Sequence, residues 1–122
     1  LKEIFYRSPF RTSIQVHKFK EETHYVLSGR GTLFYSQEIF DVAKYEKGDY
    51  TQDEIKKFIL ELKKEEITVG KVVHTKPGCI HRIEALEDLT IIESSTVELD
   101  DIIRLEDDTD RKNGRIESEH ST

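Results

Sequence analysis

Several residue types are scarce in this 122-residue chain, which has no methionine or tryptophan, one cysteine and two prolines. With Cys79 alone, no internal disulfide can form, and this favours a reducing, cytoplasmic setting. No apolar run approaches the roughly 20 residues that cross a bilayer, and none resembles the apolar segment of a signal peptide. We therefore expect a cytoplasmic protein with no membrane partner. Because methionine is absent and the chain begins at Leu1, we expect that its natural start has been trimmed or lost.

Basic charge is also in short supply. The chain has 19 Lys and Arg against 25 Asp and Glu, so its formal net charge is −6 at pH 7. A nucleic-acid interface needs a basic patch to neutralise phosphates, so we expect no nucleic-acid partner. Charged residues make up 36% of the chain and hydrophobic residues 35%, and a length of 122 residues suffices for one small soluble domain with a modest core.

The chain does contain side chains with metal-binding chemistry. Gln15, His17 and Glu22 lie close together near the N terminus, and His81 follows a Pro-Gly turn far downstream. Two imidazoles, one carboxylate and one amide oxygen form a mixed N/O set that suits a divalent first-row metal. Strand alternation places Gln15 and His17 on one face, and a hairpin would bring Glu22 beside His17. The residues alone do not establish that His81 joins them.

Three further strands are expected around these residues. An edge strand is predicted near residues 3–6, and a strand over residues 22–29 would carry Glu22 and His24 on one face. Residues 69–75 are predicted to form a strand that leads into the Pro-Gly turn. His24 would therefore line the same pocket as Glu22, or pack as a hydrogen-bonded structural histidine.

The spacing of these residues resembles the two motifs of the cupin superfamily, H-x-H-x4-E-x6-G and P-G-x2-H. Gln15 stands at the first His position of the first motif and His17 at the second, and Glu22 and Gly29 are in register. Residues 77–81 match the second motif. The resemblance implies that Gln15, His17, Glu22 and His81 converge on one divalent metal ion. Zinc is the expected ion, with manganese, iron and nickel as alternatives.

A closer resemblance is to the cupin domain of type II mannose-6-phosphate isomerases, which are often fused to mannose-1-phosphate guanylyltransferases. Residues 13–29, SIQVHKFKEETHYVLSG, resemble that family's S-L-Q-x-H-x-x-R-x-E-H-W-x-V-V-S-G. Residues 92–93, 100–104 and 107–111 resemble its I-E-V, E-D-D-I-V-R and D-D-Y-G-R segments. The sequence departs from the family at Lys20, where the family has Arg, so a relative that acts on another sugar or sugar nucleotide is an alternative.

The resemblance implies an all-β fold over residues 1–111, a small cupin double-stranded β-helix or jelly-roll barrel. Many such proteins are homodimers, and an N-terminal edge strand would be a natural pairing element. Residues 51–54, TQDE, have the capping-box pattern, and apolar residues then recur at helical spacing, so an inserted helix is predicted over about residues 52–65. We expect it to pack outside the barrel, with a substrate lid as the alternative. Residues 112–122 are polar and are predicted to be a disordered tail.

The function implied by the resemblance is a metal-dependent sugar-phosphate aldose–ketose isomerase of the mannose-6-phosphate isomerase type, which acts through an enediol. Its ligand would be a sugar phosphate or a nucleotide sugar, in carbohydrate metabolism such as polysaccharide biosynthesis. His24 and Glu93 are the candidate catalytic residues, because both could reach the pocket. Lys20, Arg82 and Arg104 are the candidate substrate-binding residues, since a guanidinium can bind phosphate in a bidentate manner.

Two other function classes stay open. Two histidines and a carboxylate also form the facial triad of non-haem iron enzymes, in which case Gln15 would be a spectator in an oxygenase or lyase. Alternatively, the protein is a non-catalytic module that binds a sugar or sugar nucleotide, because the sequence does not establish which residue would be the general base. Cys79 is interpreted as an inert buried thiol, and the acidic run over residues 98–108 as a solvated edge.

Overall fold

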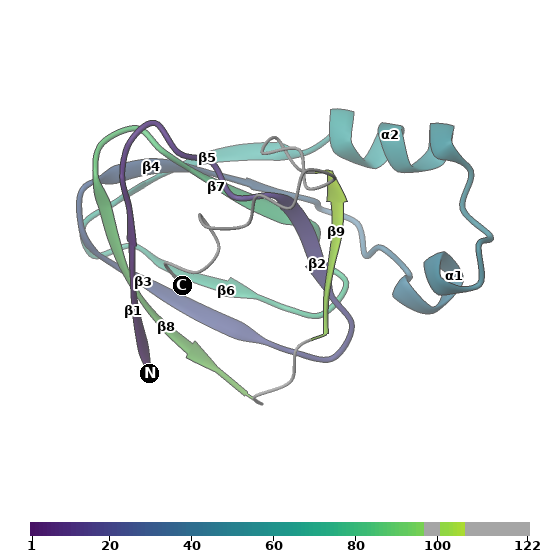
Figure 1. Ribbon diagram of the computed structural model, residues 1–122, viewed down its shortest axis with the longest axis horizontal. Helices are drawn as coiled ribbons and strands as arrows, with labels where there is room; N and C mark the ends of the chain where they lie inside the picture. Colours follow the sequence, from purple (N-terminus) through teal and green to yellow (C-terminus); the bar gives the residue numbers. More distant parts are fainter. Residues whose placement is uncertain (97–100, 107–122) are drawn as a thin grey trace.

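The structure is a computed structural model that describes residues 1–96 and 101–106 (Figure 1). The predicted disordered tail over residues 112–122 and the family-like stretch over residues 107–111 lie outside these ranges. The described elements, in chain order, are β1 (Lys2–Tyr6), β2 (Ile14–His17), β3 (Glu22–Ser28), β4 (Arg30–Tyr35), α1 (Val42–Glu46), α2 (Gln52–Leu60), β5 (Lys63–Thr68), β6 (Val72–Thr75), β7 (His81–Ala85), β8 (Leu89–Ser95) and β9 (Ile102–Glu106).

The strands form two antiparallel sheets, ordered β1-β8-β3-β6 and β5-β4-β7-β2-β9. Figure 1 shows the two sheets facing each other, with α1 and α2 set to one side of the barrel. Strand alternation gives each sheet a buried face: on β3, Glu22, His24 and Val26 are buried, whereas Tyr25 and Leu27 are exposed. The predicted all-β jelly-roll barrel is confirmed.

The main core lies between the two sheets, where residues from β1, β3 and β8 meet residues from β4, β5 and β7. Each fully buried Ile or Leu there contributes about 1.5–3 kcal/mol through burial of apolar surface. The buried members of this main core are Ile4, Tyr6, Val26, Leu33, Ile67, Val73, Ile83, Ala85, Leu89 and Ile91.

A second core cluster joins the inserted segment to the other side of β2. Ile14 and Val16 alternate with Gln15 and His17, so they point away from the barrel interior and pack with Phe40. The Phe40 ring stacks on Tyr50 with 4.5 Å between centroids and meets the edge of Phe58 at 5.2 Å. The inserted segment therefore packs on the outside of the five-stranded sheet, as expected.

The inserted helix begins where predicted but is shorter. The capping box is formed: the Thr51 hydroxyl accepts from the Glu54 amide at 3.0 Å, and the Glu54 carboxylate accepts from the Thr51 amide at 2.8 Å. α2 nevertheless ends at Leu60, so the prediction of helix to residue 65 is wrong, because residues 63–68 pair with β4 as strand β5. The short helix α1 was not predicted.

The edge strand predicted near residues 3–6 is present as β1, at one end of the four-stranded sheet. The homodimer that such an edge would permit stays a prediction. None of the helices in the described residues is both long and apolar enough to cross a membrane.

Candidate functional site

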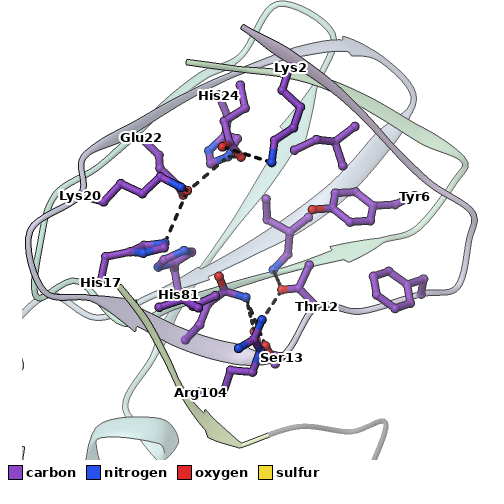
Figure 2. Close-up of a pocket in the computed structure, with 16 residues that line it drawn as sticks. Lys2, Tyr6, Thr12, Ser13, His17, Lys20, Glu22, His24, His81 and Arg104 are labelled. Carbon is purple, nitrogen blue, oxygen red and sulfur yellow. Dashed lines mark hydrogen bonds and ion pairs between the residues drawn. The ribbon is translucent and has the colours of Figure 1, made fainter. Parts of the chain in front are cut away.

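A cavity of about 210 Å³ lies inside the barrel and is lined from both sheets (Figure 2). Figure 2 shows four of the polar lining side chains, His17, Glu22, His24 and His81, pointing toward one another. The inserted helices contribute no residue to this lining. The structure thus gives no support to the alternative of a helical lid over this cavity.

β2 and the start of β3 place the first two of these side chains. Gln15 and His17 alternate with Ile14 and Val16, so they face the cavity. Glu22 opens β3 after the β2–β3 turn, and its Oε2 lies 3.4 Å from His17 Nε2. The side chains of His17 and Glu22 are both buried.

A tight turn delivers His81 to the same place. Gly78 has φ +83°, and a Cβ there would lie 2.7 Å from the Ile39 side chain, so the turn requires glycine. The Gly78 amide donates to the His17 carbonyl at 2.9 Å, which ties this turn directly to β2. The His17 and His81 rings lie 5.7 Å apart between centroids. The structure therefore brings together the two histidines and Glu22 as the motifs imply.

Hydrogen bonds orient both imidazoles in the same way. His81 Nδ1 donates to the Cys79 carbonyl at 3.0 Å, and His17 Nδ1 donates to Asp101 Oδ1 at 2.9 Å. Each ring therefore keeps Nε2 as the nitrogen for another partner. His17 Nε2 is buried, and within the described part of the chain it completes no hydrogen bond.

The charges of this cluster are strongly coupled. Burial lowers the pKa of His81 to about 4. Burial also opposes ionisation of Glu22, but the neighbouring imidazoles of His17, His24 and His81 outweigh it and lower its pKa to about 2. Burial lowers the pKa of His17, yet the carboxylates of Glu22 and Asp101 prevail, so the net shift is upward. Glu22 is therefore held as a carboxylate among imidazoles.

Gln15 lines the same cavity and pairs with His81 across β2 and β7. Its Nε2 donates to the Ser13 carbonyl at 3.3 Å and to the Ser13 hydroxyl at 3.2 Å. Because the amide nitrogen is used in this way, the amide oxygen is the atom that Gln15 can offer to a cation. Its role as a ligand stays a prediction.

The two candidate catalytic residues form a buried pair. His24 and Glu93 face each other across β3 and β8, and His24 Nε2 donates to Glu93 Oε1 at 3.1 Å. The Ser95 hydroxyl donates to Glu93 Oε2 at 3.1 Å. Burial opposes ionisation of Glu93, but the hydrogen bond from His24 prevails, so the pKa of Glu93 is lowered. Since His24 Nε2 is also 3.8 Å from Glu22 Oε1, the pair adjoins the His17–Glu22–His81 cluster.

The three candidate substrate-binding residues are separated by the fold. Lys20 and Arg104 line the cavity, and Lys20 Nζ lies 3.5 Å from Glu22 Oε2. Arg82 is buried and is not in the lining, because it follows His81 on β7 and so points to the opposite face. Its Nε donates to the Thr12 carbonyl at 3.0 Å, which is a structural contact.

Three residues that the sequence analysis did not single out also belong here. Lys2 and Tyr6 line the cavity from β1, and Lys2 Nζ is 4.0 Å from Glu93 Oε2. Asp101 contacts His17, so its interpretation as part of a solvated edge is wrong. The sequence offered no signal for Lys2, which precedes the strand predicted near residues 3–6, and none for Tyr6 beyond its place in that strand. Glu98, Asp100, Asp107 and Asp108 of the same acidic run lie outside the described residues.

The donor set fits a divalent cation. Among the residues that the structure describes, two groups of three buried side chains have ligand atoms within 4.8 Å of one another, and Glu22 belongs to both. The first group is His17, Glu22 and His81, and the second is Glu22, His24 and Glu93. The buried His17 Nε2 without a hydrogen bond is what a cation at the first group would satisfy. Imidazole and carboxylate together suit zinc, manganese, iron or nickel.

A scan against protein-family models finds no match for this chain, and a search of curated proteins finds none either. Among solved structures, the chain is similar to the capsular polysaccharide assembling protein CapF from Staphylococcus aureus. The TM-score is 0.62 with 20% identity, over 85% of this chain and 26% of CapF.

Two further solved structures share the fold. One is the QdtA 3,4-ketoisomerase from Thermoanaerobacterium thermosaccharolyticum in complex with TDP, with TM-score 0.59 and 16% identity over 84% of this chain and 63% of QdtA. The other is an oxalate oxidase in complex with the substrate analogue glycolate, with TM-score 0.60 and 10% identity over 84% of this chain and 44% of the oxidase. The chain spans less than two thirds of each of these proteins. At identities this low, the structural similarity shows a shared barrel fold alone.

Proposed function

We propose that this protein is a metal-dependent sugar isomerase that interconverts an aldose phosphate and a ketose phosphate through an enediol, as the mannose-6-phosphate isomerase type does. The observation that carries the proposal is the buried arrangement of His17, Glu22 and His81 beside the hydrogen-bonded pair His24–Glu93. A cation site and a proton-transferring pair in one cavity are the two parts that such a reaction needs. The names of two structural neighbours, a ketoisomerase bound to TDP and a capsular polysaccharide assembling protein, lend support.

His17, Glu22 and His81 would hold one divalent ion, zinc first, with the Gln15 amide oxygen as a fourth ligand. When bound, such an ion supplies Lewis-acid polarisation of the carbonyl and hydroxyl oxygens of an open-chain sugar. Glu22 suits this position because its low pKa keeps it ionised at neutral pH. Burial of the three side chains excludes water, which strengthens electrostatic interactions at the site.

The pair His24–Glu93 would move the proton between C1 and C2. Glu93 Oε1 holds the His24 ring through its Nε2–H, and Ser95 fixes the other carboxylate oxygen of Glu93. The pair would accept a proton from the carbon next to the carbonyl and return it to the neighbouring carbon. A positioned acid–base group of this kind contributes about 10²–10⁴-fold to a rate.

The substrate would be a single small sugar unit with an anionic group. The cavity of about 210 Å³ is below the roughly 300–1,000 Å³ of pockets that enclose drug-sized ligands. Lys20 and Arg104 line it and would bind the phosphate, with Arg104 able to do so in a bidentate manner. A nucleotide sugar would have to leave its nucleotide outside the cavity.

A second candidate follows from the composition of the donor set. The ionisable side chains of the first group are two histidines and one carboxylate, the set used by non-haem iron oxygenases. The Gln15 amide nitrogen donates to Ser13, so Gln15 can be satisfied without a metal contact. A preference for iron with oxygen-dependent turnover would select this function.

The test is elemental analysis of protein purified without chelator or an affinity-metal column, with assay of hexose phosphates. We expect near one equivalent of zinc or manganese and isomerase activity, and loss of both in His81→Ala. His74→Ala is the matched control, because His74 is exposed on β6 and is absent from the cavity lining. Full activity in metal-free protein would refute the metal-dependent isomerase. Tight sugar binding without turnover would favour the non-catalytic module.

A further inference from the structure

Asp101 makes three short contacts just before β9. Its Oδ1 accepts from His17 Nδ1 at 2.9 Å, and its Oδ2 accepts from the backbone amides of Phe19 at 2.6 Å and Lys20 at 3.0 Å. One carboxylate thus reaches both the last residue of β2 and the turn that leads to Glu22. The contact with His17 joins residues that are 84 positions apart in the sequence.

These contacts determine which nitrogen of His17 carries the proton. A carboxylate accepts hydrogen bonds and cannot donate one when ionised, so the short contact to Nδ1 requires a proton on that nitrogen. In the neutral ring Nε2 then carries the lone pair. That nitrogen is buried and lies 3.4 Å from Glu22 Oε2, on the side of the cavity.

The two backbone amides keep Asp101 from turning away. Because Oδ2 is held by Phe19 and Lys20, the carboxylate plane is fixed relative to the β2–β3 turn, and Oδ1 stays aimed at His17. His81 achieves the same orientation with a backbone carbonyl, that of Cys79. His17 differs in that its partner carries a negative charge, which makes the ring a stronger electron donor.

We propose that Asp101 is a positioning residue that holds His17 with its proton on Nδ1 and its Nε2 lone pair directed into the cavity toward a divalent cation. The cation part rests on the function proposed above, whereas the orientation of the ring does not. Partners that orient metal-bound histidines in this way typically contribute about 10–100-fold to metal affinity.

A purely structural role makes a different prediction, and the chain offers a matched control. Asp88 also links segments that are distant in the sequence, since its Oδ1 accepts a hydrogen bond from the backbone amide of Ser8 at 2.9 Å. Asp88 is not in the cavity lining. Asp88→Asn and Asp101→Asn make the same chemical change. If Asp101 only linked distant segments, both variants would lose stability and neither would change which nitrogen of His17 carries the proton.

The experiment compares wild type, Asp101→Asn, Asp101→Ala and Asp88→Asn. Zinc affinity is measured by titration calorimetry on metal-free protein. Nitrogen NMR of the His17 ring in metal-free protein, at a pH high enough to leave it neutral, reports which nitrogen carries the proton. Thermal unfolding of each metal-free variant shows that it folds, and Asp101→Asn is the milder change should Asp101→Ala not fold.

We expect the wild type and Asp88→Asn to share one zinc affinity, with the His17 proton on Nδ1. Asp101→Asn should lower the affinity about 10–100-fold and shift the proton toward Nε2. An unchanged affinity in Asp101→Asn, or a wild-type ring protonated on Nε2, overturns the proposal. If the wild type binds no zinc or other divalent ion, the proposed function fails, and the NMR comparison alone decides the role of Asp101.

Discussion

The two ends of the barrel interior are built from the same strands and differ completely in chemistry. On β3 the inward residues pass from Glu22 and His24 to Val26, and on β7 they pass from His81 to Ile83. All of them are buried. One end is therefore an apolar core and the other is a cluster of ionisable groups. Alternation decides only which face a side chain takes, whereas position along the strand decides which end it reaches.

Antiparallel pairing brings the polar positions together. The start of β3 lies beside the end of β8, so His24 pairs with Glu93, while Val26 pairs with Ile91. The apolar end gains free energy from burial, but the polar end must offset the cost of removing charges from water. It does so with specific partners, as in His24–Glu93 and His17–Asp101. The free energy gained by burial at the apolar end therefore helps to hold the ionisable side chains together at the polar end, where burial by itself is unfavourable.

The largest expected effect comes from removing one charge at the polar end. Glu93→Gln keeps the size of the side chain but removes the carboxylate that accepts from His24, so we expect turnover to fall about 10²–10⁴-fold. Metal bound at the His17–Glu22–His81 group should be retained, since Glu93 is outside that group. Steady-state kinetics with metal analysis would measure this. Glu38→Gln, on an exposed residue, is the control, and equal turnover in the two variants would contradict the role of Glu93.

The next largest effect is expected from a substitution at the apolar end, which should change stability. Leu89→Ala removes a side chain that is 0% exposed, so we expect a loss of about 2–5 kcal/mol in the free energy of unfolding. Denaturant unfolding would measure it. The folded fraction should still bind metal at the polar end. Leu60→Ala, the same change at a residue that is 85% exposed, should be nearly neutral. Similar losses in both variants would argue against the observed core.

Acid should destabilise the metal-free protein through the polar end. The pKa of His81 is 6.5 ordinarily and about 4 when buried, so between these values the unfolded chain takes up a proton that the folded protein does not. Stability therefore falls as pH falls through this range. Glu22, with a pKa lowered from 4.5 to about 2, continues the loss at lower pH, because its carboxylate must then be protonated.

The expected loss of unfolding free energy is below the roughly 3 kcal/mol that the full His81 shift would give, because a range from pH 6.5 to pH 4 ends at the folded pKa of His81. The raised pKa of His17 changes stability little over this range, since the stability that it contributes is present below pH 6.5 and is lost as pH rises through the raised value. Urea unfolding of metal-free protein from pH 6.5 to pH 4 would measure the net change. A shallower dependence is expected in His81→Asn, and stability that rises on acidification would contradict the assignment.

The smallest effect lies outside the barrel altogether. Thr51→Ala removes the N-cap of α2, and we expect a loss of about 1 kcal/mol with unchanged metal binding. Thermal unfolding would detect it. Glu54→Gln is the control, because glutamine also completes a capping box. A change in metal affinity in Thr51→Ala would link the inserted helix to the cavity, which the lining does not suggest.

Much of the fold followed from local patterns in the sequence. Alternation on β2 and β3 correctly assigned the inward faces, and the TQDE pattern correctly placed the start of α2. The end of α2 was missed because Ile55, Phe58 and Ile59 continue to Leu62 at helical spacing. The competing signal is not local: residues 63–68 become a strand because the edge of β4 is available to pair with them.

The site shows the same division. The resemblance to the cupin motifs implied that Gln15, His17, Glu22 and His81 would meet, and the structure brings them to one cavity. Arg82 was predicted to bind substrate because its guanidinium lies near the second motif and could bind phosphate, yet one step along a strand from His81 reverses the face. Asp101 was wrongly interpreted as part of a solvated edge, because its role depends on a contact with His17 across 84 positions.

The sequence by itself determined the inward faces of the central strands and the donor types that could hold a cation, and its resemblance to the cupin motifs implied the barrel class. The inward faces depend on period-two alternation, whose physical cause acts within a few residues. Only the tertiary structure decided that His24 pairs with Glu93 and that Asp101 orients His17. Such contacts join strands from distant parts of the chain, and strand pairing and packing in three dimensions determine which side chains meet.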